Sequence, residues 1–122
     1  MPDLMPVDAG WWVRTVLQDR WRACVELRGE IDLAGAPDLE RHLGAHLRAG
    51  RRFLRVDTGQ LEFIDCTALA VLVRADRTCR ARHGSLILGG ASVQLRRLLS
   101  LALLDEVLLV ETAEPLVGGA VS

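Results

Sequence analysis

The chain has 122 residues, of which 50% are hydrophobic and 25% charged, so it holds material for one domain with a core and does not have the composition of a disordered chain. The formal net charge is −1 and all fifteen basic residues are arginines scattered among acids, so neither nucleic acid nor an anionic membrane is expected as a partner. Three cysteines without a CxxC pair indicate a reducing cytoplasm rather than a disulfide framework.

The first ten residues are expected to be a flexible leader before a single domain over residues 11–122. They carry an acid where a signal peptide begins with basic residues, and they contain no apolar run. The apolar stretches elsewhere are far shorter than the roughly 20 residues of a membrane-spanning helix. The protein is therefore expected to be cytoplasmic, without membrane insertion.

Two strands joined by a turn are predicted to open the domain. Residues 11–17 and 21–27 suit strands, because apolar and polar side chains alternate along the second of them. Trp11 and Trp21 stand one on each side of the turn, so they are candidates for facing each other across a hairpin. The stretch "GEIDLAGAP" is then expected to break the second strand.

A helix is predicted next, between Pro37, which suits a first helical turn, and Gly50, which suits a C-terminal stop. Its apolar residues recur every four positions and form one stripe. That stripe consists of Leu39, Leu43 and Leu47.

Strands and helices alternate through the rest of the chain. "RFLRVDT" reads as a buried strand and "GQLEF" as a loop or strand extension, followed by a helix from Cys66 or Thr67 to His83. "LILGG" is a strand, Ser92 is placed to cap a third helix, and "EVLLV" is a last strand before a tail that can hold at most a short helix. This order predicts an α/β fold: a mostly parallel mixed sheet of about five strands with an N-terminal hairpin, and helices packed against it.

The stretch "FIDCTALAVLV" places three polar residues, Asp65, Cys66 and Thr67, between a strand end and a helix start. The carboxyl edge of a parallel sheet is where ligands and partners of such folds bind, and a helix N-terminus stabilises negative charge, including that of a phosphate. The structural alternative is that Asp65 or Thr67 only caps the helix and Cys66 only fills space. The residues of this junction alone leave both interpretations open.

Three segments together resemble the STAS domain, which sulphate transporters and bacterial anti-sigma factor antagonists share. They are "VELRGEIDLAGAPDLERHL", "FLRVDTGQLEFIDCTALAVLV" and "GSLILGGASVQLRRLLSLALLDEVLLV", and the resemblance covers about residues 11–111. The motifs that carry it are Gly29-Glu30-Ile31-Asp32, Val56-Asp57, and Phe63-Ile64-Asp65 followed by two small residues and Leu69. The resemblance to stand-alone antagonists implies a non-enzymatic regulator without a cofactor. Such a protein binds an anti-sigma factor, typically a serine kinase, and thereby frees a sigma factor.

The resemblance also implies a site. In the family, the kinase phosphorylates a serine just after the aspartate, and the added charge breaks the complex. That position falls on Cys66, which has no hydroxyl group, whereas the next residue, Thr67, matches and Ala68 replaces the usual glycine. Asp32 matches an acid of the loop that lies near the phosphosite in the family. The expected partner-binding residues are Asp32, Asp65, Cys66, Thr67, Ala68 and Arg74, the last because its helix borders the site.

Three hypotheses follow for the switch. In the first, the binding surface persists without the off-switch, which gives a constitutive antagonist. In the second, Thr67 is the phosphate acceptor. In the third, oxidation of Cys66 replaces phosphorylation.

Other kinds of site and function have less support in the sequence. The alternative function is a STAS subunit of a membrane transport complex that binds its ATPase through the same edge. A nucleotide-binding or enzymatic domain lacks a phosphate-cradling loop, because the glycine pair at 89–90 is too short a motif. His42 and His46 are spaced like metal ligands, but no third ligand has a suitable spacing, so they are expected at a boundary or in solvent, with no metal site. The sequence does not indicate an oligomeric state.

Overall fold

The computed structural model describes residues 10–112 and confirms the predicted order of elements. The expected leader, apart from Gly10, and the tail after residue 112 lie outside the described residues. In chain order the elements are β1 (Trp11–Gln18), β2 (Arg22–Ile31), α1 (Ala36–Arg48), β3 (Phe53–Ile64), α2 (Cys66–Ala81), β4 (Ser85–Ala91), α3 (Val93–Leu101) and β5 (Leu109–Thr112).

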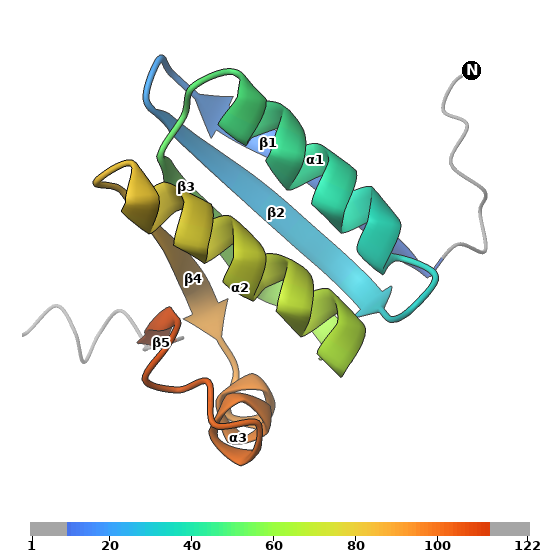
Figure 1. The fold of residues 1–122 in the computed structure, drawn as a ribbon. Helices are drawn as coiled ribbons and strands as arrows, with labels where there is room; N and C mark the ends of the chain where they lie inside the picture. The colour runs from blue at the N-terminus through green and yellow to red at the C-terminus, as the bar shows by residue number, and fades with distance from the viewer. Residues whose placement is uncertain (1–9, 113–122) are drawn as a thin grey trace, which may run out of the picture.

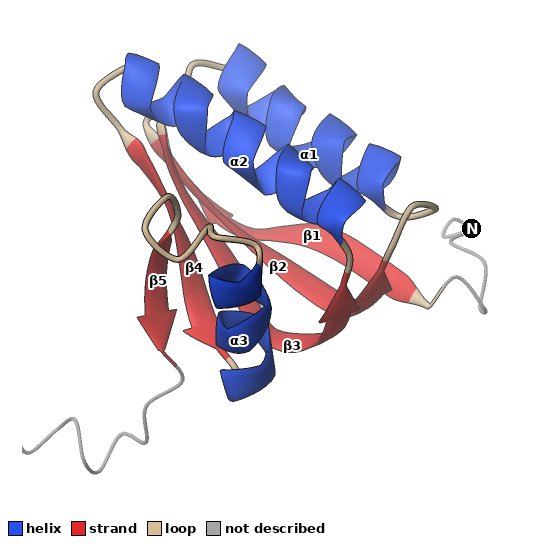
Figure 2. Ribbon diagram, turned by 60° about the horizontal axis from the view of Figure 1, so that its bottom comes forward, coloured by secondary structure: helices blue, strands red, loops and turns tan. Residues whose placement is uncertain are grey.

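The five strands form one sheet in the order β1-β2-β3-β4-β5, in which β1 is antiparallel to β2 and the other neighbours are parallel. Each parallel connection contains a helix, and α1 and α2 lie side by side on the same face of the sheet (Figure 1). The helix α3 lies by the end of β4 (Figure 2). The face of the sheet opposite α1 and α2 carries no helix (Figure 2). The predicted α/β class with a mixed sheet and an N-terminal hairpin is therefore confirmed.

The hydrophobic core lies between the sheet and the two parallel helices. Strand residues that point toward the helices are buried, whereas their neighbours point to the helix-free face, which is the expected alternation. The predicted leucine stripe of α1 is confirmed, because Leu39 and Leu43 are buried and Leu47 packs partly against the core. The core also contains Val25, Leu27, Ile31, Leu54, Val56, Leu69, Leu72, Cys79, Leu86 and Leu88.

The predicted end of the second strand is wrong, since β2 continues through "GEI" to Ile31. Gly29 has a φ of +86°, which glycine adopts at little cost, and a Cβ added there would lie 2.0 Å from the carbonyl oxygen of Gly10. The same carbonyl accepts a hydrogen bond of 2.8 Å from the amide of Glu30. Gly29 therefore lets β2 continue where the chain entering β1 comes close, and the extension carries the strand to the edge of the sheet.

The two tryptophans do not face each other. Trp11 pairs with Gly29, and its indole Nε1 donates to a carboxylate oxygen of Asp38 at 3.4 Å, whereas Trp21 lies in the turn before β2. The register shifts between Thr15 and Leu17 in β1, which is a bulge that the alternation of the sequence does not reveal.

The two histidines of α1 face the sheet. Thr15 Oγ1 lies 3.1 Å from Nε2 of His42 and 2.7 Å from Nε2 of His46. His46 is buried and His42 is half-buried, so the expected boundary or solvent position is wrong for His46. The reason is that α1 turns this face toward Thr15 of β1. Within residues 10–112, no three His, Cys, Asp or Glu side chains are grouped to hold a metal ion.

Stability is expected to fall as the pH drops below about 6.5, because burial lowers the pKa of both His42 and His46 from the ordinary value of 6.5. The unfolded chain then binds protons that the folded chain does not, so the free energy of unfolding decreases with falling pH. Denaturant unfolding between about pH 7.5 and 5.5 measures this slope. The slope should flatten in the double variant His42→Gln and His46→Gln, and an equal slope in that variant would contradict the assignment.

Candidate functional site

Strands β2 and β3 end together and bring two loops to one edge of the sheet. Ile31 pairs with Ile64 in the parallel register, and the amide of Asp65 donates to the carbonyl oxygen of Ile31 at 3.1 Å. Asp32 and Asp65 are the residues that directly follow these two strand ends, so they lie on neighbouring chain segments. The structure therefore places the expected loop acid beside the start of α2.

Each of the two acids orders its own loop. A carboxylate oxygen of Asp32 accepts a hydrogen bond from the amide of Ala34 at 3.0 Å, which is a local turn that precedes α1. A carboxylate oxygen of Asp65 accepts one from the amide of Ala68 at 3.0 Å, so Asp65 is the N-cap of α2. Of the two capping alternatives, Asp65 is thus the one that the structure shows, and Thr67 lies inside the helix.

Cys66 and Thr67 are the first two residues of α2, and both are exposed. The chain's other two thiols differ from that of Cys66. Burial raises the pKa of Cys79 to about 11, and burial followed by the charge of Asp57 raises the pKa of the half-buried Cys24. Cys66 is therefore the most exposed of the three thiols.

A groove of about 410 Å³ runs along α2 from Cys66, and we call it the α2 groove. Its polar rim includes Arg74, whose guanidinium lies 3.3 Å from a carboxylate oxygen of Glu40 in an exposed ion pair. Such a pair contributes little to stability, so Arg74 is available to a second carboxylate. The α2 groove is lined by Cys66, Leu69, Ala70, Val73, Arg74, Arg77, Ala102 and Leu104.

Of the six expected residues, Cys66 and Arg74 line this groove, whereas Asp32, Asp65, Thr67 and Ala68 do not. Asp32 lies in the neighbouring loop, outside the groove lining. Ala68 is fully buried, so its side chain packs the start of α2 and offers a partner no surface. We correct its expected role accordingly, because a small residue at this position serves close packing.

Sequence reasoning missed two apolar residues beside the acids. Leu33 follows Asp32 and is 69% exposed, and Phe63 precedes Asp65 by two residues and is 52% exposed. Large apolar side chains at a polar loop edge are typical anchors of protein interfaces. The available signal for Leu33 was a leucine within a glycine- and alanine-rich loop. Phe63 belongs to a motif of the family resemblance, but its exposure was not expected, because its segment was predicted as a loop or strand extension.

Comparisons with known proteins agree with this architecture. A family model described as "Mlab, STAS domain" matches residues 16–111. The chain is 31% identical over 91 residues to the anti-sigma-B factor antagonist of Listeria monocytogenes, which covers 75% of this chain and 80% of that protein. An anti-sigma factor antagonist from Mycobacterium paratuberculosis has a similar structure, with a TM-score of 0.70 and 25% identity over 82% of this chain and 86% of that one.

The unphosphorylated anti-sigma factor antagonist SpoIIAA of Bacillus has the same fold, with a TM-score of 0.67 and 14% identity over 90% of this chain and 94% of that one. Within residues 10–112, no helix is both long and apolar enough to cross a membrane. The family model covers most of the chain, and its match includes β2, β3 and α2, the elements that build the site. On these grounds, the chain belongs to the STAS domain family.

Proposed function

We propose that this protein is an anti-sigma factor antagonist that acts in the cytoplasm by binding an anti-sigma factor of the serine-kinase type. The observation that carries the proposal is the 31% identity to a Listeria protein named as such an antagonist. The protein acts by binding and not as an enzyme. Release of a sigma factor from the captured anti-sigma factor is the expected output.

The surface proposed for binding is the edge formed by the two loops and the start of α2. It presents carboxylates from Asp32 and Asp65, the exposed Cys66 and Thr67, and the apolar side chain of Leu33. An exposed apolar side chain that a partner can bury, surrounded by charged groups, is what a specific interface requires. The α2 groove extends this surface toward Arg74.

Co-purification from the native host tests the partner. The tagged protein should retain a kinase-type anti-sigma factor, identified by mass spectrometry. Transport proteins also contain this domain, so the competing outcome is retention of a transporter ATPase. That result would show that the protein is instead a STAS subunit of a membrane transport complex. The variant Leu33→Asp, which alters the loop between β2 and α1 within the proposed surface, serves as the control, and it should retain neither partner.

We propose further that the usual off-switch is absent, since the position expected for the phosphoserine is Cys66. A thiol gives a serine kinase no hydroxyl acceptor, so the antagonist would stay active. The two alternatives are transfer of the switch to Thr67 and oxidation of the exposed Cys66 thiol, which adds polar oxygen at the same place.

Incubation with the partner kinase and ATP should leave the wild-type protein without phosphate, whereas Cys66→Ser should gain a phosphate on residue 66. The reason is that the substitution supplies the missing hydroxyl at an exposed helix start, where the dipole stabilises the added charge. Peptide mass spectrometry locates the phosphate. A phosphate on Thr67 of the wild type would end the hypothesis of a constitutive antagonist, and Thr67→Val is the matched control.

A further inference from the structure

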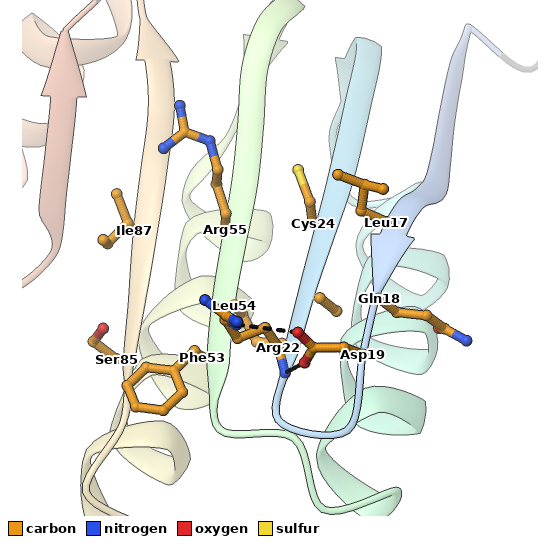
Figure 3. A pocket seen from close by; sticks show the side chains of 11 residues that line it. Leu17, Gln18, Asp19, Arg22, Cys24, Phe53, Leu54, Arg55, Ser85 and Ile87 are labelled. Carbon is orange, nitrogen blue, oxygen red and sulfur yellow. Dashed lines mark hydrogen bonds and ion pairs between the residues drawn. The ribbon is translucent and has the colours of Figure 1, made fainter.

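A cavity of about 460 Å³ lies on the helix-free face of the sheet (Figure 3). It is built at the amino ends of β3 and β4 and at the hairpin of β1 and β2, whereas Asp65 lies at the carboxyl ends of the strands. Its volume falls within the range of small-molecule sites, roughly 300–1,000 Å³. The proposed partner surface makes no use of this cavity.

Apolar side chains from four neighbouring strands form one part of the cavity lining. Leu17 is 72% exposed on β1, and Phe53 and Ile87 stand on β3 and β4. The thiol of Cys24 points out of β2 between Leu17 and Arg55 (Figure 3). Apolar side chains gathered on an open sheet face mark a binding surface, because water contact at these positions is unfavourable.

Two guanidinium groups accompany this apolar surface. Arg22 reaches across the cavity and Arg55 leans toward β4 on the same face (Figure 3). Arg22 pairs through Nε with Asp19 at 3.2 Å, and Arg55 pairs through Nη2 with Glu111. Each pair uses only part of a guanidinium, which carries several N–H donors in a planar fork. Because the side chains of Asp19 and Glu111 are 51% and 55% exposed, both pairs are weak and exchangeable.

We propose that this cavity binds a small amphipathic carboxylate, with its apolar tail over Leu17, Cys24 and Ile87 and its carboxylate on Arg22 and Arg55. The two arginines are paired with Asp19 and Glu111, so an incoming carboxylate would displace one of these exposed acids from its guanidinium rather than meet an uncompensated positive charge. The planar fork of arginine fits a carboxylate through two parallel hydrogen bonds. The inference is independent of the proposed partner, and it assigns a second site at the other end of the strands.

Decanoate below its micelle concentration is a suitable probe, and alkylation by N-ethylmaleimide is the readout. Saturating decanoate should slow alkylation of Cys24 about tenfold, because the tail would cover the thiol, and leave the rate at Cys66 unchanged. Peptide mass spectrometry separates the two sites within one sample. Cys66 lies at the opposite end of the strands and is therefore an internal control for general effects on reactivity.

Two comparisons test the role of the carboxylate. Decanol has the same tail without the charge, so it should protect Cys24 only at a concentration about tenfold higher than decanoate. A tenfold loss of affinity is what removal of a charge-assisted hydrogen bond is expected to cause. The double variant Arg22→Met and Arg55→Met should weaken protection by decanoate to the same degree and leave protection by decanol unchanged. Arg96→Met on the exposed side of α3 should change neither.

The proposal is overturned if decanoate leaves the rate at Cys24 unchanged, if decanol protects equally well, or if the Arg22 and Arg55 variant binds decanoate like the wild type. It is also overturned if Cys24 of the full chain resists alkylation as completely as the buried Cys79, because the cavity would then be covered by another segment or by a second copy.

Discussion

Replacing Cys66 by aspartate is expected to weaken binding of the anti-sigma factor about 100-fold. Residue 66 is exposed at the start of α2, so a charge placed there would be covered without a counter-charge when the partner docks. Leaving one charge uncompensated in an interface costs about 3 kcal/mol, which corresponds to roughly a hundredfold change in the dissociation constant. Titration calorimetry with the co-purified partner measures the change.

The fold should tolerate this substitution, which separates a loss of binding from a loss of structure. A carboxylate in the first helical turn interacts favourably with the helix dipole, so the melting temperature should stay constant or rise slightly. Cys66→Asn is the neutral control of similar shape and should bind much better than Cys66→Asp. An affinity for Cys66→Asp within about threefold of the wild type would place residue 66 outside the interface.

The second large effect is expected on stability: Gly84→Ala should lower the free energy of unfolding by about 3 kcal/mol. Gly84 connects α2 to β4 beside the start of β3, and a Cβ at this position would lie 1.8 Å from the carbonyl oxygen of Arg52. That carbonyl also accepts the amide of Ser85 at 3.0 Å, so relief of the clash would disturb the first contact between β3 and β4. Thermal unfolding should show a melting temperature lower by roughly 10 °C.

Gly44→Ala is the matched control, and its effect should have the opposite sign. Gly44 lies inside α1, and its added Cβ would meet only the far end of the flexible Arg48 side chain, at 3.1 Å. Alanine is the better helix former by up to about 1 kcal/mol, so this variant should be slightly more stable than the wild type. If Gly84→Ala changes the free energy of unfolding by no more than Gly44→Ala does, the chain relaxes freely around residue 84.

The sequence predicts a structural feature correctly where that feature depends on a single helix or on a single junction between elements. The capping role of Ser92 follows from its type and place, and its hydroxyl oxygen accepts the amide of Leu95 at 3.0 Å. The inward positions of Leu72 and Cys79 on α2 follow from helical spacing. The junction at Asp65 was equally readable, because the change from strand to helical periodicity marks it in the sequence.

Contacts between distant segments were not readable in this way. Asp76 stands among arginines in the sequence, yet it is buried on α2, where its carboxylate accepts from the guanidinium of Arg80 at 2.8 Å and from the amide of Leu86 at 3.3 Å. The reason is the position of β4 against α2, which periodicity does not specify. Likewise, Leu33 became a candidate anchor only when its exposure at the sheet edge was known.

The sequential strand order has a practical consequence. The described chain enters through β1 and leaves through β5, which are the two outermost strands, whereas Cys66 follows the central β3. Trp11 pairs with Gly29 near the end of β2, and β5 runs parallel to β4, so both described ends of the chain open at the sheet edge that carries Asp32 and Asp65. A bulky fusion partner joined directly before Gly10 or after Thr112 would therefore stand beside the proposed partner surface and compete with docking there.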